Sequence, residues 1–269
     1  MFERLEKGEL ALGSDTLTHG VEWLEVLGQA GLDFACVDMM VTSIDWGHVA
    51  DMVRACSRYG MTPWVRVQAF PWHGSGFDPR LSSDVLRAVS LGAEAITASV
   101  NTAEEVSAMV AALRAGHRRP YVWKPFAGAW EPPVDVEPIV FPLLESLEAV
   151  NSVDEMLDVD GVAAVFVGMG DLTRLLGHHG DDRHADVRAM IKDVVRKARN
   201  RGKFVICNFW ALHRPDAITP EYSAEKIEWL HDAGVSVVWM PGMHWVVQRF
   251  YERVLDCVSD RSLKEPVVD

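Results

Sequence analysis

The sequence predicts an α/β protein, a single (β/α)8 barrel that spans residues 1–269. Apolar, strand-like runs alternate with amphipathic helical stretches from end to end, and eight such units fit a chain of 269 residues. A doubly wound open sheet is the competing architecture. It is disfavoured because no Gly-x-Gly-x-x-Gly motif follows the first strand and no P-loop occurs.

The first half of the chain holds four strand–helix units. Strands are expected at 9–13, 33–38, 62–68 and 95–100, and helices at 18–30, 45–58, 80–90 and after Thr102. Asp45 is suited to cap the second of these helices. Thr102 and Glu105 have the spacing of a capping box, in which each side chain bonds the backbone N–H of the other residue.

The second half holds the other four units. Strands are expected at 138–144, from 165 onward, at 204–208 and at 236–240, and helices at 147–157, 182–200, 223–233 and 244–258. Asp182 is expected to be the N-cap of the helix at 182–200. Before this half, residues 117–138 are rich in proline and contain Trp123 and Trp130. That composition indicates an active-site loop, because a flexible linker would not be aromatic.

Composition and charge exclude several classes of function. The net charge of −13 and the pI of about 5.2 leave no basic surface for nucleic acid. No stretch has the length of a membrane span, and the charged N-terminus does not resemble a signal peptide. The four cysteines show no Cys-x-x-Cys spacing, which is typical of reduced thiols in a cytoplasmic protein.

Two carboxylates follow neighbouring strands of the predicted barrel. Glu145 comes directly after the strand at 138–144, and Asp171 follows an apolar run that ends in Gly168-Met-Gly170. The carboxyl ends of parallel strands lie at the same end of a barrel, and active sites are commonly built there. Mg²⁺ takes one or two protein carboxylates and completes its coordination with water and substrate oxygens. The pair therefore predicts a cation site, although Glu145 alone would also serve as a helix cap.

Arg66 is the candidate for handling a negatively charged substrate. It alternates with Val65 and Val67, so it faces the opposite side of its strand, toward the barrel interior or the catalytic rim. A charge in that place needs a partner. A structural ion pair with Asp38 is the alternative interpretation.

Several stretches together resemble the HpcH/HpaI family of metal-dependent (class II) pyruvate aldolases. They are Gly31–Asp38, Thr62–Val67, Val100–Val106, Leu144–Val150 and Gly161–Gly177. The resemblance implies a barrel of the phosphoenolpyruvate/pyruvate type that assembles as a homo-oligomer, a trimer or hexamer. It also implies that the last helix, at about 244–258, is exchanged between subunits.

The same resemblance assigns roles to residues. It implies Mg²⁺ or Mn²⁺, or else Co²⁺, held by Glu145 and Asp171, and a 2-oxo acid held by Arg66, which also stabilises its enolate. The substrate carboxylate would meet backbone N–H groups around Met169, Gly170 and Asp171. These roles agree with the chemistry, since a metal polarises the keto oxygen and a guanidinium adds positive charge where the enolate oxygen develops.

The chain departs from the family where protons are handled. Val41 stands where the family has a histidine, and Asp38, which would orient that histidine, remains. Leu143 replaces a glutamine, and His117–Lys124 replaces an Arg-Arg-Gly-Val-Gly loop. Asp38 would then orient a water molecule or a new base.

Loop residues are the candidates for the missing functions. His73, His213 and His244 each follow a strand at the catalytic end and could take over proton transfer, with an ordinary loop histidine as the alternative. Of these we select His73. Trp123 and Lys124 are expected to line the substrate pocket. The histidine-rich stretch at 178–184 is expected to be a loop and not a metal site.

We therefore expect a metal-dependent carbon–carbon lyase or aldolase whose partner is a small 2-oxo acid. One alternative is a decarboxylase or an enolate-condensing enzyme acting on an oxaloacetate-like acid with an unusual acceptor. It follows from the loss of the histidine, because decarboxylation needs no base to take an alcohol proton. The other alternative is a catalytically inactive barrel that only binds or assembles.

Overall fold

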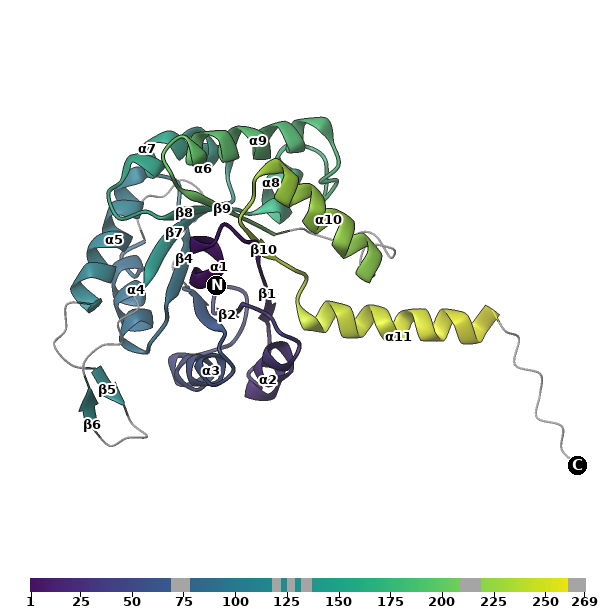
Figure 1. Cartoon of the computed structure of the whole chain (residues 1–269), viewed down its shortest axis with the longest axis horizontal. Coiled ribbons are helices and arrows are strands. Elements are labelled where there is room, and N and C mark those ends of the chain that lie inside the picture. The colour runs from purple at the N-terminus through teal and green to yellow at the C-terminus, as the bar shows by residue number, and fades with distance from the viewer. Residues whose placement is uncertain (69–77, 118–121, 125–128, 132–136, 209–218, 261–269) are drawn as a thin grey trace, which may run out of the picture.

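The computed structural model describes residues 1–68, 78–117, 122–124, 129–131, 137–208 and 219–260. Eight parallel strands form a closed barrel, which confirms the predicted fold (Figure 1). The strands are β1 (Ala11–Thr16), β2 (Phe34–Asp38), β3 (Thr62–Arg66), β4 (Ala95–Ser99), β7 (Ile139–Leu144), β8 (Ala164–Val167), β9 (Phe204–Asn208) and β10 (Val237–Trp239). They follow one another around the barrel in chain order, and β1 closes the ring against β10.

Helices surround the barrel on its outer side (Figure 1). They are α2 (Val21–Gln29), α3 (Trp46–Arg58), α4 (Leu81–Ser90), α5 (Ala103–His117), α6 (Leu147–Asn151), α7 (Val153–Asp158), α8 (Met169–Leu175), α9 (Ala185–Arg199) and α10 (Pro220–Ala233). A short α1 (Phe2–Glu6), absent from the sequence prediction, packs Leu5 into the barrel interior. The predicted caps are confirmed: Asp45 accepts from two backbone N–H groups, and Thr102 and Glu105 exchange hydrogen bonds.

The observed boundaries correct several expectations. β1 begins at Ala11 and ends at Thr16, because its last residues, although polar, pair with β2. The helix expected at 147–157 is broken at Ser152 into α6 and α7. Residues 117–138, expected to be a loop, include the antiparallel strands β5 (Val122–Lys124) and β6 (Ala129–Glu131).

The expected N-cap of the helix at 182–200 was wrong. α9 begins after His184, whose ring accepts a hydrogen bond from the Asp186 N–H. Asp182 is instead buried and forms an ion pair with the equally buried Lys226 of α10. The demand of Lys226 for a counter-charge explains why Asp182 is not at the helix end, since a buried ammonium is costly without a partner.

An aromatic cluster fills the barrel interior. Trp64 of β3 lies at its centre, with ring centroids 5.0 Å from Phe34, 4.6 Å from Phe141, 5.5 Å from Phe166 and 5.3 Å from Trp239. Gly13 leaves room for this packing, because a Cβ there would lie 2.4 Å from the Phe34 ring. A second, larger core joins the outer faces of the strands to the helices. Side chains therefore fill the barrel interior, and a site can form only at its carboxyl end.

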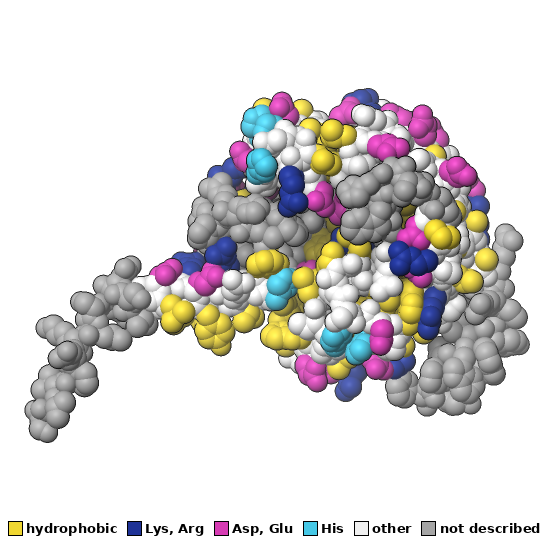
Figure 2. All heavy atoms as spheres, turned by 180° about the vertical axis from the view of Figure 1, so that it is seen from behind, with side chains coloured by type: hydrophobic (Ala, Val, Ile, Leu, Met, Phe, Trp, Pro, Cys, Tyr) yellow, Lys and Arg dark blue, Asp and Glu magenta, His cyan; other side chains and the backbone are white. Residues whose placement is uncertain are grey.

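The last helix, α11 (Met243–Asp260), projects away from the barrel (Figure 1). Figure 2 shows hydrophobic side chains along one side of it. They are Val246, Val247, Phe250, Tyr251, Val254 and Leu255, which are 36–65% exposed. An amphipathic helix normally buries such a face against another element. Across the described ranges, no helix combines the length and apolarity that crossing a bilayer requires.

Candidate active site

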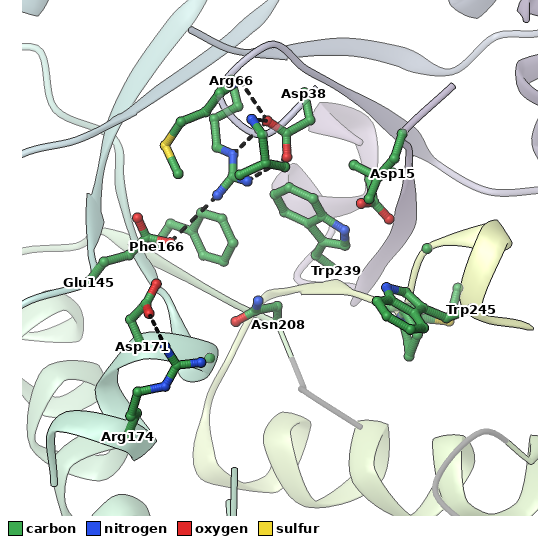
Figure 3. Close-up of a pocket in the computed structure, with 17 residues that line it drawn as sticks. Asp15, Asp38, Arg66, Glu145, Phe166, Asp171, Arg174, Asn208, Trp239 and Trp245 are labelled. Atoms are coloured by element: carbon green, nitrogen blue, oxygen red, sulfur yellow. Dashed lines mark hydrogen bonds and ion pairs between the residues drawn. The ribbon is translucent and has the colours of Figure 1, made fainter. Parts of the chain in front are cut away.

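A cavity of about 350 Å³ opens at the carboxyl ends of the strands. Side chains from seven strands or the turns after them line it (Figure 3). They include Asp15 of β1, Asp38 of β2, Arg66 of β3, Glu145 after β7, Asn208 of β9 and Trp239 of β10, together with Asp171 of α8. This is the end of a barrel at which enzymes of this fold build their active sites.

Asp38 and Arg66 form a two-pronged ion pair inside the mouth of the barrel. The guanidinium donates from Nε to Oδ1 at 3.0 Å and from Nη2 to Oδ2 at 2.5 Å. The side chains are 1% and 12% exposed, so water screens the pair little. Asp38 Oδ1 also accepts from the Met40 N–H at 2.9 Å, which fixes the turn after β2. Arg66 thus points into the cavity, and the ion pair with Asp38 is present.

Arg66 stays charged in this setting. Burial alone would lower its pKa, but Asp38 and, further away, Glu145 raise the pKa of the guanidinium above its ordinary value. Its Nη1 lies 3.5 Å from Glu145 Oε1, and its Cζ lies 5.7 Å from the centre of the Trp239 ring. The guanidinium is therefore a fixed positive charge held between two carboxylates and an aromatic face.

Glu145 follows β7 and turns into the cavity. Its Oε2 accepts a short hydrogen bond from the hydroxyl group of Ser99, at the end of the adjacent β4. Gly168, at the end of β8, makes room for it, because a Cβ there would lie 2.6 Å from Glu145 Cγ. Burial raises the pKa of Glu145, Arg66 and Ser99 oppose that shift, and the charge of Asp171 adds to it. Glu145 is not a helix cap, since Ser146 caps α6.

Asp171 lines the same cavity as Glu145. It lies in the first turn of α8, directly after β8, and is 54% exposed with Arg174 Nη1 at 4.0 Å. The two acids thus come from adjacent strand–helix units, and the charge of Asp171 raises the pKa of Glu145. Oxygen donors beside a solvent-open cavity fit a hard divalent cation.

The turn into α8 is only partly available to a ligand. The backbone N–H of Met169 donates to Asn208 Oδ1 at 2.8 Å, and the Met169 side chain is buried. Met169 is therefore committed to holding β8 and β9 together. Gly170 and Asp171 do line the cavity. Of the three N–H groups expected to meet a substrate carboxylate, Met169's already has a partner.

Several lining residues were not anticipated from the sequence. Asp15 was missed because β1 was expected to end at Gly13, and Asn208 and Trp239 were treated only as strand residues. The period-two alternation of β1 could have found Asp15, since it places Ala11, Gly13 and Asp15 on one face. Val41, which replaces the family histidine, lies at the cavity rim and is 58% exposed.

The candidate loop residues fall mostly outside the described chain. His73 and His213 lie beyond the described residues, as do the side chains of Trp123 and Lys124, so their roles stay predictions. His244 begins α11 and does not line the cavity. Both of its ring nitrogens are buried without a partner among the described residues, and burial lowers the pKa of the imidazole.

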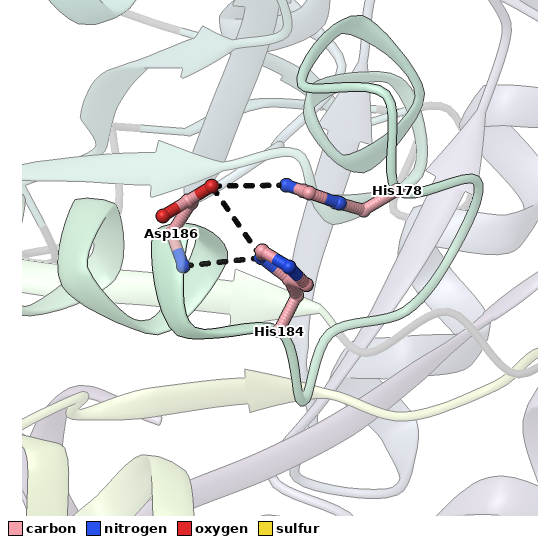
Figure 4. Close-up of side chains that lie close together, drawn as sticks. All are labelled: His178, His184 and Asp186. Atoms are coloured by element: carbon pink, nitrogen blue, oxygen red, sulfur yellow. Dashed lines mark hydrogen bonds and ion pairs between the residues drawn. The ribbon is translucent and has the colours of Figure 1, made fainter.

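The histidine-rich stretch brings three side chains together (Figure 4). His178 Nε2 and His184 Nδ1 lie 3.2 and 3.5 Å from Asp186 Oδ2, and the two rings stack 3.4 Å apart. His184 Nδ1 is also the acceptor that caps α9. The cluster is thus explained by helix capping and by the contact of His178 with Asp186, away from the barrel cavity.

Comparison with known proteins agrees with this geometry. The chain is 31% identical to a hydroxypyruvate/pyruvate aldolase from Rhizorhabdus wittichii over 210 residues, which cover 74% of this chain and 79% of the relative. It is 30% identical to a 4-hydroxy-2-oxo-heptane-1,7-dioate aldolase from Klebsiella pneumoniae, covering 66% and 68%.

The fold is shared with solved structures as well. The crystal structure of an HpcH/HpaI aldolase from Desulfitobacterium hafniense superimposes with a TM-score of 0.78 at 21% identity, covering all of this chain and 98% of the other. A model of the HpcH/HpaI aldolase/citrate lyase family matches residues 44–241. The protein is therefore an enzyme of the HpcH/HpaI aldolase/citrate lyase family.

Proposed function

We propose that the protein is a class II aldolase that makes or breaks a carbon–carbon bond next to the enolate of a pyruvate-type 2-oxo acid. The observation that carries this proposal is the convergence of Glu145, Asp171 and Arg66 on one cavity. Relatives at about 30% identity are named as aldolases, which favours this reaction over a decarboxylase or an inactive barrel.

Glu145 and Asp171 would hold the cation, which is Mg²⁺ or Mn²⁺ by the preference of hard oxygen donors. A divalent ion bound there would act as a Lewis acid on the keto oxygen of the substrate. Arg66, braced by Asp38, supplies a fixed positive charge for the enolate oxygen. Such preorganised charge is worth most when it does not move during the reaction.

The cavity wall also suggests how the substrate is oriented. Gly170, at the start of α8, offers backbone to the substrate carboxylate, while Phe166 and Trp239 form an apolar floor. Arg174 is exposed at the outer rim, where the second reactant would enter. This arrangement keeps the charged end of a 2-oxo acid near α8 and its reacting carbon over the aromatic floor.

The proposal is tested with Glu145→Gln and Asp171→Asn, which keep shape and remove charge. Mn²⁺ binding is measured by calorimetry, and pyruvate formation from a 4-hydroxy-2-oxo acid is followed in the same preparations. We expect both variants to lose tight Mn²⁺ binding and metal-dependent turnover. Asp186→Asn, in the exposed cluster with His178 and His184, is the control and should retain both. Full activity in both cavity variants would disprove the proposal.

We further propose that α11 packs its apolar face against a second copy of the chain, as the last helix does in the expected trimer or hexamer. Support comes from the exposed Phe250, Tyr251 and Leu255 on a helix that leaves its own barrel.

All four cysteines are unpaired thiols, so we place the protein in the reducing cytoplasm.

A further inference from the structure

Cleaving a carbon–carbon bond next to a hydroxyl group requires a group that takes the hydroxyl proton. Six charged side chains line the cavity, namely Asp15, Asp38, Arg66, Glu145, Asp171 and Arg174. If the protein is an aldolase, as proposed above, one of these groups must have an oxygen atom that is free to accept the hydroxyl proton. Val41, at the rim, carries none.

Five of the six are already committed. Both oxygens of Asp38 accept from Arg66, and Oδ1 also accepts from the turn after β2. Glu145 accepts a hydrogen bond from Ser99 and forms an ion pair with Arg66, and together with Asp171 it is assigned to the cation. The guanidinium groups of Arg66 and Arg174 cannot accept a proton.

Asp15 is the remaining group, and it is placed by the barrel itself. It is the third inward-facing residue of β1 after Ala11 and Gly13, one step from the carboxyl end of the strand. The residue is 7% exposed, and its Oδ1 is buried without a hydrogen-bond partner among the described residues. A buried carboxylate oxygen without a partner is costly, and such costs are typically retained at functional sites.

The surroundings of Asp15 tune it for proton exchange near neutral pH. Burial and the charge of Asp38 raise the pKa of Asp15 to about 6, while Trp239 and Arg66 oppose the shift. His244 faces it from the start of α11, since a Cβ on Gly242 would lie 2.2 Å from Asp15 Oδ1 and 2.8 Å from His244 Cε1. No other described residue of the cavity combines a spare oxygen with such a setting.

We propose that Asp15 is the proton-transfer group of this aldolase, in place of a histidine. In cleavage, the Asp15 carboxylate takes the proton of the substrate hydroxyl. The carbon–carbon bond then breaks, the hydroxyl-bearing carbon becomes an aldehyde or ketone, and the electron pair forms the enolate. The proton returns from Asp15 to the enolate carbon, which gives the 2-oxo acid and restores the carboxylate. In condensation the same steps run backward.

Asp15→Asn is the variant that tests this, because it keeps the shape and removes the base. Two reactions of the full-length, Mn²⁺-loaded protein are compared from pH 5 to 9: cleavage of 4-hydroxy-2-oxopentanoate, and decarboxylation of oxaloacetate, which has no hydroxyl proton to remove. We expect Asp15→Asn to lower cleavage by about 10²–10⁴-fold. Mn²⁺ affinity should remain close to that of the wild type. Decarboxylation should fall far less than cleavage, because its only proton step is protonation of the enolate carbon, which water can also supply.

The pH dependence separates a proton-transfer role from a structural one. Wild-type cleavage should fall as pH drops through about 6, because Asp15 becomes protonated, and this limb should be absent from the residual activity of Asp15→Asn. Asp33→Asn is the control: its carboxylate bonds the Leu12 N–H at the other end of β1, and its activities should match the wild type.

Three outcomes would overturn the inference. Asp15→Asn could retain cleavage with the same acid limb, or lose cleavage and decarboxylation equally, which would indicate a structural role. If the wild-type protein turned over neither acid in a Mn²⁺-dependent manner, the proposed function itself would fail, and the role of Asp15 with it.

Discussion

Asp38 and Arg66 are register partners on β2 and β3, and two hydrogen bonds join their side chains across the strands. The pair holds the guanidinium at the cavity edge while removing both charges from water. Its geometry makes the carboxylate a brace for the arginine. It also makes the site and the stability of the barrel depend on the same contact.

Asp38→Asn should therefore destabilise the protein and weaken catalysis together. Breaking a buried ion pair from one side leaves the other charge uncompensated and typically costs about 3–5 kcal/mol. Urea denaturation followed by circular dichroism would measure the change. Asp160→Asn, at an exposed pair with Arg114, is the matched control and should leave the midpoint unchanged. If the urea midpoint of Asp38→Asn equalled that of the wild type, the ion pair with Arg66 would contribute nothing to the free energy of unfolding.

Arg66→Lys should separate charge from geometry. Lysine keeps the positive charge but cannot make the two-pronged contact with Asp38, so the charge is no longer fixed at one point. We expect kcat to fall by roughly 10²–10³-fold, as for the loss of one oxyanion donor, with a smaller effect on KM. Steady-state kinetics would decide, and an unchanged kcat would argue against Arg66 as the enolate-stabilising group.

Asp15→Asn should increase stability at neutral and alkaline pH. The pKa of Asp15 is raised to about 6 from an ordinary 3.8, so the folded protein binds this proton more tightly than the unfolded chain. The resulting stability is complete below about pH 4 and is lost as pH rises through 6, a change of about 3 kcal/mol. Asparagine stays neutral throughout.

The variant should therefore exceed the wild type by about 2–3 kcal/mol in unfolding free energy at pH 8, and by little at pH 4. Denaturation at the two pH values measures the difference. A variant less stable than the wild type at pH 8 would mean that Asp15 is well paired when charged.

The buried pair of Lys226 and Asp182 should behave as a unit. Lys226→Met leaves a carboxylate buried alone and should cost about 3–5 kcal/mol, and adding Asp182→Asn should restore much of the loss. A double-mutant cycle in urea provides the coupling energy. Glu225→Gln, which loosens the exposed pair of Arg183 and Glu225 on the same helix, should change little. Additive effects of the two buried substitutions would contradict a coupled pair.

Phe250→Asp should disperse an oligomer built on α11. Phe250 is 62% exposed in the single chain and stands in the middle of the apolar face. A charge there would oppose its burial against a second copy. Analytical ultracentrifugation would report the change in mass, and Asp256→Lys, on the opposite face by helical spacing, is the control. A wild-type protein that sediments as a monomer would rule out this assembly.

The sequence was informative where local rules decide the structure. Alternating apolar runs located all eight strands, and side-chain chemistry identified the caps at Asp45 and Thr102. The neighbouring positions of Glu145 and Asp171 followed from strand order. In these places a residue's surroundings are set within a few positions of the chain.

The rest depended on contacts between distant segments. Asp182 resembled a helix cap in the sequence, but in the structure it forms an ion pair with Lys226, 44 positions later. Asp15 fell outside the strand expected at 9–13, because pairing with β2 extends β1 to Thr16. His244 followed a strand as expected but is not among the residues that line the cavity. Such placements arise from closure of the barrel, which single-segment patterns do not encode.

Trp239 occupies the boundary between the barrel interior and the cavity. Its indole packs 5.3 Å from Trp64 below, and the guanidinium of Arg66 lies over it at 5.7 Å. A molecule that settles against Arg66 must alter the electric field and the solvent around this ring. The enzyme thus carries a built-in optical probe, whose emission would respond to occupancy of the cavity without an added label.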